Sequence, residues 1–393
     1  MKALFVSNLF PDRSQPYRGL DNATVLHHLA RDFEIRAIAL RPSLPFMGRL
    51  SVAREADTEF EPVFARVPYL PKVGSLVNHR LAAGALRRPL HELRRRFPFE
   101  VVLGSWIYPD CCALAILAKE EGFPFVAIAQ GSDVHQYLRN PVRRRVIQQW
   151  LPLASGVITR SAELARLLAE GGILRERLHP VYNGIDFETF RTGSRSEARQ
   201  ALGLPKDAPI ILFVGNLLPI KNPLLLVEAH ASLCRDEKRF QSAHLVMVGG
   251  GPLDRTIRQN ADALGFGTQV QLAGRCRAEE VARFMQAADV LCLPSQNEGV
   301  PNVILEAFAC GLRVVASRVG GIPEVHPGDG FGKLTPAGDA AVLRAALSEV
   351  LAGSFDREAI HFHARQFSWE RAASAYREIL SRTVTEKNQP LVA

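Results

Sequence analysis

The chain has 393 residues, which is too long for one ordinary domain and fits two of about 190 residues each. Apolar residues make up 47% and charged residues 22%, a composition that supports sizeable buried cores and excludes a disordered chain. The six cysteines form no C-x-x-C pair, so we expect neither a disulfide framework nor a zinc site. The start, MKALFVSNLFPD, is typical of a first β-strand, and no apolar run reaches 18 residues. We therefore expect a cytoplasmic protein.

The net charge of +8 is unevenly distributed along the chain. Residues 1–200 hold 28 Lys and Arg against 20 Asp and Glu, whereas residues 201–393 hold 20 of each. Two segments, LRRPLHELRRRF at 86–97 and RNPVRRRVIQQW at 139–150, interleave arginine with apolar residues. Such segments can lie on anionic lipid headgroups, which would place the protein at the inner face of the plasma membrane, or they can be solvated faces. We expect no nucleic-acid partner, because no recognition motif accompanies the charge.

Strands and helices alternate through the first half of the chain. Strand patterns occur at 2–7, 35–40, 101–106, 124–129 and 156–161. Helical patterns occur between them and after them, at 23–33, 113–122 and 163–172. Alternation of strands with helices of 10–15 residues predicts a parallel sheet covered on both faces.

The second half repeats this alternation after a polar break that follows Asn183-Gly-Ile-Asp186. Expected strands lie at 210–215, 244–249, 269–274, 290–295 and 313–318, with helices between them. We therefore predict a first Rossmann-like domain over 1–187, a linker over 188–208 and a second domain over 209–367. A last helix with its tail, 368–393, is expected to pack back towards the first domain. The fold class is α/β, with two doubly wound domains that present the carboxyl ends of their strands across a cleft.

The strongest motif is Glu298-Gly-Val-Pro-Asn-Val-Ile-Leu-Glu306, directly after an expected strand. Pro301 and Asn302 open a helix, and unpaired amides there, together with the helix dipole, suit a phosphate. The carboxylates of Glu298 and Glu306 are hydrogen-bond acceptors that match sugar hydroxyls at two ends of one elongated ligand. By spacing alone, an ordinary capped helix with surface acids fits equally well.

In its setting the motif resembles the donor site of retaining glycosyltransferases of family 4, which have the GT-B fold and often build exopolysaccharides and cell-surface glycans. Those enzymes carry Glu-x7-Glu followed by Cys-Gly and Gly-Gly-x-Pro-Glu. The matching segments here are Glu298 to Glu306, Cys310-Gly311, Gly320 to Glu324, the interdomain Asn183 to Asp186, the glycine-rich turn Val248 to Pro252, and Gly131-Ser132-Asp133. The resemblance covers residues 1 to about 380 and is most specific in the second half.

The resemblance implies a role for each matching residue. The implied contacts are the nucleotide ribose for Glu306, hydroxyls of the transferred sugar for Glu298, the diphosphate for the amides of Asn302 and Val303, and phosphate for Lys221 and for the loop of Gly19. We take Glu298, Lys221 and Asp133 as the predicted catalytic residues. Without the resemblance, Lys221 reads as solvated charge and Gly19 as a turn glycine.

Two positions depart from the family pattern. Asn216 stands where the family usually has an arginine ahead of the lysine, so one positive charge facing the leaving diphosphate is missing. Arg275 or Arg18 are candidates to supply it, and we include Asn216 and Arg275 among the predicted donor-binding residues. Gln130 stands where many members have histidine, and glutamine cannot exchange a proton near neutral pH.

Some motifs are absent from the sequence. It has no Asp-x-Asp pair, no G-x-x-x-x-G-K-[ST], and no G-x-G-x-x-G spacing at its triple glycine. We therefore predict a metal-independent, cofactor-free retaining glycosyltransferase that uses a UDP- or GDP-sugar. The expected acceptor is a glycan or a lipid-linked glycan intermediate of polysaccharide biosynthesis. The alternatives are a transferase acting on a small soluble acceptor, a nucleotide-sugar-binding protein without turnover, and a nucleotide-sugar epimerase of the same fold.

Overall fold

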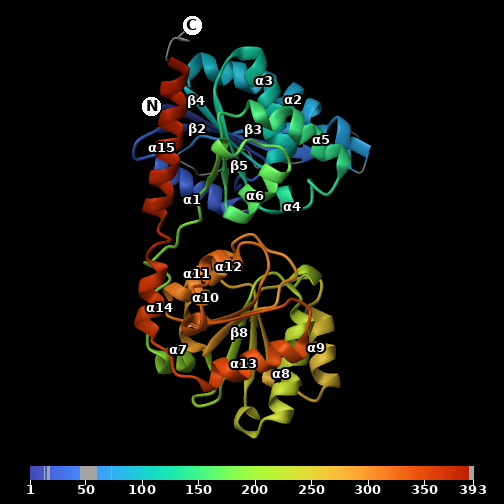
Figure 1. Ribbon diagram of the computed structural model, residues 1–393, viewed down its shortest axis with the longest axis vertical. Helices are drawn as coiled ribbons and strands as arrows, with labels where there is room; N and C mark the ends of the chain where they lie inside the picture. Colours follow the sequence, from blue (N-terminus) through green and yellow to red (C-terminus); the bar gives the residue numbers. More distant parts are fainter. Residues whose placement is uncertain (13, 16–17, 45–59, 72, 389–393) are drawn as a thin grey trace. The chain divides into compact units, whose positions relative to one another are not determined.

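The chain divides into two compact units in the computed structural model, which describes residues 1–12, 14–15, 18–44, 60–71 and 73–388 (Figure 1). Unit 1 comprises Met1–Asn183 and the chain from Trp369 onward, and unit 2 comprises Gly184–Ser368. The chain thus enters unit 2 a few residues before the boundary predicted at 187, and it leaves unit 2 at the residue after 367. The part of the expected tail from residue 389 lies outside the described residues.

Unit 1 is built on a seven-stranded parallel sheet. Its strands are β1 (Lys2–Ser7), β2 (Glu34–Ser43), β3 (Val63–Pro68), β4 (Val101–Ser105), β5 (Phe125–Ala129), β6 (Gly156–Thr159) and β7 (Leu178–Pro180), in the order β3-β2-β1-β4-β5-β6-β7. The order reverses between β1 and β4, and at such a point open α/β sheets bind ligands beyond the carboxyl ends of their strands.

Helices cover both faces of this sheet because its strands are apolar on both sides. In β1, Leu4 and Val6 point into one core and Ala3 and Phe5 into the other. The helices of unit 1 are α1 (Leu20–Leu29), α2 (Asn78–Arg96), α3 (Cys112–Glu121), α4 (Ser132–His135), α5 (Pro141–Trp150), α6 (Ala162–Glu170) and α15 (Trp369–Asn388), with short helical turns η1 (Val73–Leu76), η2 (Ile107–Cys111), η3 (Leu151–Leu153) and η4 (Arg175–Arg177).

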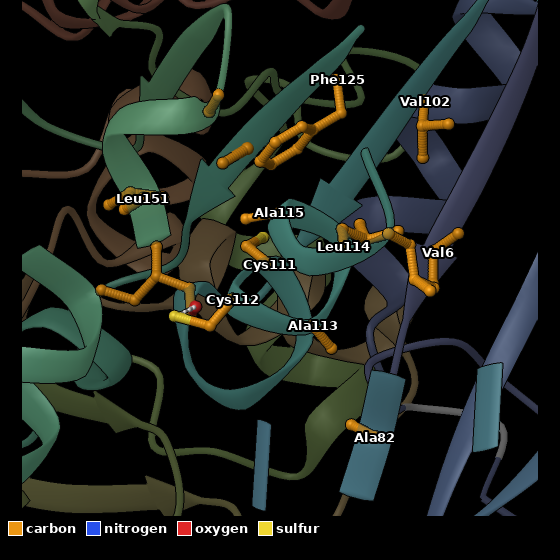
Figure 2. Close-up of a cluster of buried hydrophobic side chains, with 14 of the residues drawn as sticks. Val6, Ala82, Val102, Cys111, Cys112, Ala113, Leu114, Ala115, Phe125 and Leu151 are labelled. Carbon is orange, nitrogen blue, oxygen red and sulfur yellow. Dashed lines mark hydrogen bonds between the residues drawn. The ribbon is translucent and has the colours of Figure 1, made fainter. Parts of the chain in front are cut away.

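The larger core of unit 1 contains the two adjacent cysteines. Figure 2 shows Cys111 and Cys112 among Val6, Val102 and Phe125. The Cys112 thiol donates a hydrogen bond to the Ile107 carbonyl, with sulfur and oxygen 3.2 Å apart. All six cysteines are free thiols.

The last helix, α15, belongs to unit 1 and packs against α1 (Figure 1). Tyr376 and Leu380 of α15 are almost fully buried in the second core of this unit, beside Phe5 and Val25. The chain therefore returns to the first sheet after completing the second one, because the apolar face of α15 fills a site over β4, β5 and β6.

Unit 2 is built on a six-stranded parallel sheet. Its strands are β8 (Ile210–Val214), β9 (His244–Val248), β10 (Val270–Gly274), β11 (Val290–Leu293), β12 (Val314–Ser317) and β13 (Gly332–Thr335), in the order β10-β9-β8-β11-β12-β13. Its helices are α7 (Arg195–Leu202), α8 (Pro223–Asp236), α9 (Asp254–Ala263), α10 (Ala278–Ala287), α11 (Asn302–Ala309), α12 (Ile322–Val325), α13 (Ala340–Ala352) and α14 (Arg357–Ala364), with turns η5 (Pro219–Lys221), η6 (Lys238–Phe240), η7 (Gly267–Gln269) and η8 (Asp329–Phe331). The predicted fold class, two doubly wound α/β domains, is confirmed.

The segment 188–208, expected as a linker, is a folded part of unit 2. It carries α7, which packs against α10. Arg199 of α7 is only 3% exposed and donates to the carbonyl oxygens of Ala287, Pro205, Lys206 and Ala208. The segment was predicted as a linker because it is polar. One of its charged residues, Arg199, is instead buried, with N–H donors paired to backbone carbonyls.

Candidate active site

In unit 2, the predicted site residues lie on the loops that follow the carboxyl ends of β8, β9, β10 and β11. Glycines allow these loops to pack closely. A Cβ atom on Gly249 would lie 1.9 Å from the Gly215 carbonyl oxygen, and one on Gly320 would lie 1.9 Å from that of Glu298. The backbone amide of Gln296 also donates to the Ile220 carbonyl at 2.8 Å, which joins the loop after β11 to the turn that carries Lys221.

The structure brings Lys221 and Glu298 into direct contact. Lys221 Nζ lies 2.5 Å from Glu298 Oε1, and the Ser295 hydroxyl donates to the same carboxylate oxygen at 2.6 Å. The Lys221 side chain is 23% exposed and that of Glu298 is 9% exposed. A cation and a hydroxyl-accepting carboxylate therefore lie together beside the start of α11.

Helix α11 begins at Asn302, as the motif predicted. Pro301 precedes it with no side-chain cap on the first turn. The amides of Asn302 and Val303 lie in the first turn of this helix, where the positive end of the helix dipole favours an anion. Glu306 is half-buried, just over one turn into the same helix.

The remaining donor-side candidates lie near the glycine-rich turn. Arg275 is exposed, and its side chain packs against Gly250, where a Cβ atom would lie 3.5 Å from it. Asn216 is exposed directly after the strand β8 and its following glycine. Of the two arginines considered as a substitute for a charge at position 216, Arg275 shares unit 2 with Lys221, whereas Arg18 lies in unit 1.

In unit 1, Gly19 and Gln130 line one pocket of about 220 Å³, together with Leu9, Leu20, Asp21 and Asn22. Gly19 has φ 67° and caps α1, and a Cβ atom there would lie 2.3 Å from the Leu9 carbonyl, so only glycine fits. The Gln130 side-chain amide nitrogen donates to Asn22 Oδ1 and to Ser105 Oγ, both at 2.7 Å. Its two N–H donors are thus occupied, and its carbonyl oxygen is the atom it can offer to a ligand hydroxyl.

Asp133 does not present its carboxylate to this pocket. It is fully buried and accepts backbone N–H bonds from Ile107, Gln130 and Gly131 at 2.8–3.0 Å. Burial raises its pKa even though these bonds favour the charged form. The carboxylate of Asp133 therefore holds the loop that carries Gln130.

A second buried carboxylate, Asp110, was not singled out by the sequence. It accepts the Asn8 backbone amide at 2.6 Å and the Asn8 side-chain amide at 2.8 Å. Burial raises its pKa to about 7, opposed by these two bonds. Arg18 donates through Nε to the Asn8 carbonyl at 2.7 Å, so Asp110, Asn8 and Arg18 form one network beside the Gly19 loop. Because Asn8 and Asp110 are 102 positions apart, no local pattern indicates this pairing.

The two basic segments of unit 1 take different roles. In α2, Arg87 and Arg94 pair with Glu120 and Glu121 at the end of α3, and Arg88 pairs with Glu92.

In α5, Arg143 turns towards aromatic rings, with its guanidinium carbon 4.5 Å from the Tyr137 centroid and 5.6 Å from that of Tyr108. Its Nε donates to Ser75 Oγ at 3.1 Å. Asn140 caps α5 by accepting from the Arg143 backbone amide, which sets the position of this arginine in the first turn.

Among the described residues, no helix is both long and apolar enough to cross a membrane. The same part of the chain holds no group of three or more His, Cys, Asp or Glu side chains arranged to bind a metal ion.

Two family descriptions match the chain, one for each unit. "Glycosyl transferases group 1" matches residues 194–367, and "Glycosyltransferase Family 4" matches residues 15–189. Solved structures share the fold: sucrose-phosphate synthase from Thermosynechococcus elongatus (TM-score 0.77, 19% identity, 98% of this chain and 100% of that one) and Anabaena Alr3699/HepE in complex with UDP and glucose (TM-score 0.74, 21% identity, 97% and 100%).

Several curated relatives carry the name D-inositol 3-phosphate glycosyltransferase. The protein from Saccharomonospora viridis is 33% identical over 257 residues, which is 61% of this chain and 59% of that protein. The one from Geodermatophilus obscurus is 36% identical over 248 residues, 59% and 54% respectively. A relative from Catenulispora acidiphila is 30% identical over 293 residues, 72% of this chain and 67% of its own length. The match thus spans little more than half the length of the first two relatives. The names of all three specify a small phosphorylated acceptor, not a polysaccharide. The chain belongs to the group 1, family 4 glycosyltransferases and has their GT-B fold.

Proposed function

We propose that this protein transfers a sugar, with retention of anomeric configuration, from a nucleotide sugar to a small phosphorylated polyol. The observation that carries the donor half is the Lys221–Glu298 pair beside the amino terminus of α11. A diphosphate fits Lys221 and the amides of Asn302 and Val303, while the carboxylates of Glu298 and Glu306 accept hydroxyls of the sugar and the ribose. HepE, a neighbour in fold, was solved with UDP and glucose, which favours a UDP-linked donor for the first trials.

Transfer is proposed to need no metal ion. As the diphosphate departs it gains negative charge, and a fixed cation and aligned amides stabilise that charge without reorganising. Lys221 and the first turn of α11 supply such groups. The resemblance to family 4 enzymes supports a transfer step without a metal ion.

The acceptor proposal rests on Arg143 and the aromatic rings around it. Tyr137 lies at the centre of the group, with Trp106 and Tyr108 packed edge-on against it at 6.1 and 5.6 Å between centroids. Arg143 stacks on this group and, within the part of the chain that the structure describes, its side chain hydrogen-bonds only through Nε, to Ser75. Its two terminal nitrogens can bind a phosphate in the forked geometry that arginine favours, and the half-buried rings of Trp106 and Tyr137 suit the apolar face of a polyol, whereas Tyr108 is buried beneath them. The names of the curated relatives point to the same acceptor class.

The lipid-linked acceptor expected from the basic first half has less support. Three arginines of the segment 86–97 pair with glutamates, so much of their charge is neutralised locally. A binding protein without turnover and an epimerase are not favoured by the family or by the relatives. Both remain distinguishable outcomes of the experiment below.

The test is release of free nucleotide from UDP-glucose, UDP-N-acetylglucosamine or GDP-mannose, each with and without D-inositol 3-phosphate. We expect release only when donor and acceptor are both present. Arg143→Gln should raise the KM for D-inositol 3-phosphate at least tenfold and leave the donor KM unchanged. Arg144→Gln, an exposed neighbour on the same helix, is the matched control. Release with a polyprenyl-linked glycan in vesicles, and none with the phosphorylated polyol, would overturn the acceptor proposal.

A further inference from the structure

Unit 2 has a concave surface at the amino ends of its strands, opposite to the end that carries the candidate donor site. Two pockets of about 230 and 340 Å³ adjoin there and share Arg195 and Phe355 in their linings. We call them together the arginine pocket. Its charged lining residues are four arginines, Arg195, Arg199, Arg313 and Arg357, against two aspartates, Asp207 and Asp289. Figure 1 shows α7 and α14, which carry Arg195 and Arg357, on one side of this unit.

The position of the pocket follows from the parallel sheet. Asp289 immediately precedes β11 and Arg313 immediately precedes β12, so both lie at the amino ends of strands. Lys221 and Glu298 follow the carboxyl ends of β8 and β11. The two sites are therefore separated by at least a strand length, roughly 13–16 Å for strands of four or five residues.

The charges in the pocket are not balanced by its own acids. Asp289 is already shared, since it pairs with Arg195 at 2.5 Å and with Arg199 at 2.7 Å and also accepts the Ile210 amide. Within the described part of the chain, neither Arg313 nor Arg357 has a carboxylate within 4 Å. Arg357 donates to the Cys310 carbonyl at 3.2 Å.

Arg313 shows most clearly that a counter-ion is missing. It is only 5% exposed, its NH1 donates to the Gly353 carbonyl at 2.9 Å, and its Nε has no partner among the described residues. Its guanidinium stacks on Phe355 with the carbon 3.8 Å from the ring centroid. Burial lowers the pKa of Arg313 to about 10, opposed by Asp289. A guanidinium held out of water without an anion is costly, and a ligand that brings negative charge removes that cost.

We propose that the arginine pocket binds a phosphate dianion, either inorganic phosphate or a phosphomonoester, as a second anion site separate from the donor site. The excess of two positive charges in the lining matches one dianion. Arg357 and Arg195 approach it from the two helices, and Arg313 forms the buried floor. Phe355 offers an apolar surface to the organic part of a monoester. Because the arginine pocket lies at the amino ends of the strands and the candidate donor site lies at their carboxyl ends, its ligand acts as an effector or a stabiliser and takes no part in the transfer step.

The test is calorimetric titration of the full chain with inorganic phosphate and with phenyl phosphate, at constant ionic strength set by chloride. We expect Arg357→Gln to weaken phosphate binding at least tenfold and Arg357→Lys to restore part of it. Arg313→Gln should do the same, and Arg357, which is only half-buried, keeps the test valid if the buried variant fails to fold. Arg344→Gln, a half-exposed arginine elsewhere in unit 2, is the matched control.

Lys221→Ala separates this site from the donor site. Phosphate binding that survives in Lys221→Ala and is lost in Arg357→Gln supports the proposal. Tighter binding of phenyl phosphate than of inorganic phosphate assigns the site to a monoester, and equal binding assigns it to the free ion. No binding above the chloride control, or binding that Arg357→Gln leaves intact, overturns the proposal.

Discussion

Lys221 Nζ and Glu298 Oε1 lie 2.5 Å apart, and the hydroxyl of Ser295 donates to the same carboxylate oxygen at 2.6 Å. Lys221, proposed to bind the diphosphate, thus neutralises the charge of Glu298, proposed to bind the transferred sugar. Donor binding must share or break this pair, since the lysine gains a phosphate and the carboxylate gains hydroxyls. The pair therefore keeps both charges compensated before the donor arrives, which matters because both side chains are largely buried.

The two glutamates of the motif should differ in what they bind. Glu306→Ala should weaken binding of the free nucleoside diphosphate by about 1–3 kcal/mol, because a ribose hydroxyl loses its acceptor. Glu298→Ala should spare that binding, or strengthen it by releasing Lys221, while turnover falls. Calorimetry with UDP and steady-state kinetics check both variants. Equal losses of UDP affinity would contradict the proposed division of roles.

Asp133 should act through the loop it holds. The two carboxylate oxygens of Asp133 accept three backbone N–H bonds, and Asp133→Asn replaces one of these oxygens with an NH₂ group that faces N–H donors, so we expect a loss of about 1–3 kcal/mol of stability. Turnover should fall because Gln130 shifts, with little change in UDP affinity. The pH profile of kcat should keep its shape in this variant. A profile that loses one ionisation would instead make Asp133 a proton-transfer group.

Asp110 should make stability depend on pH between about 4 and 7. Its pKa in the folded chain is about 7 against an ordinary value of 3.8, so across this window the folded state binds more protons than the unfolded state. Stability contributed by the protonated form is complete below the lower value and is lost as the pH rises to 7, by a few kcal/mol at most.

Asp110→Asn, which is neutral at every pH, checks this expectation. The melting temperature of the variant relative to wild type should rise as the pH increases from 4 to 7.5. Asp236→Asn, at an exposed carboxylate of unit 2, is the control. A difference for Asp110→Asn that stays constant over this pH range would contradict the expectation.

Chelation should leave transfer intact. If Lys221 and the first turn of α11 meet the charge of the leaving diphosphate, as proposed, activity in excess EDTA should stay within about twofold of the untreated enzyme. The measurement is initial rate after dialysis against EDTA, with and without added Mg²⁺ or Mn²⁺. Complete loss restored by either ion would show that a metal takes part.

Sequence patterns located the strands apart from β3, β7 and β13, together with the loops after β8 and β11, because those depend on local chemistry. Residues 210–214 form an uninterrupted apolar run, which predicts a buried strand. The motif residues Glu298, Pro301 and Glu306 lie within nine consecutive positions, so their pattern can be recognised in the sequence. The network of Asn8 with Asp110 and the stack of Arg143 on Tyr108 join residues that are far apart in the sequence. In the sequence Arg143 is one of three consecutive arginines, and only the fold shows which one faces the aromatic rings. For the same reason, burial of Asp133 could not be predicted from a Gly-Ser-Asp segment.

Lys221 should carry most of the charge stabilisation at the leaving group, since Asn216 offers none. A cation placed where charge develops acts mainly in the transition state, so Lys221→Ala should lower kcat by roughly 10²–10³. Lys221→Arg should recover only part of the activity, because a planar guanidinium does not reproduce a compact ammonium between the Glu298 carboxylate and a phosphate. Asn216→Arg should be tolerated or should raise kcat, since Asn216 is exposed and the added side chain has room. Steady-state kinetics with one identified donor and acceptor compare the three variants.

The double variant Lys221→Ala with Asn216→Arg is the decisive measurement: recovery of kcat shows that the site needs a positive charge at the diphosphate. Near-wild-type kcat in Lys221→Ala alone would place that charge on Arg275, which packs on the neighbouring glycine turn.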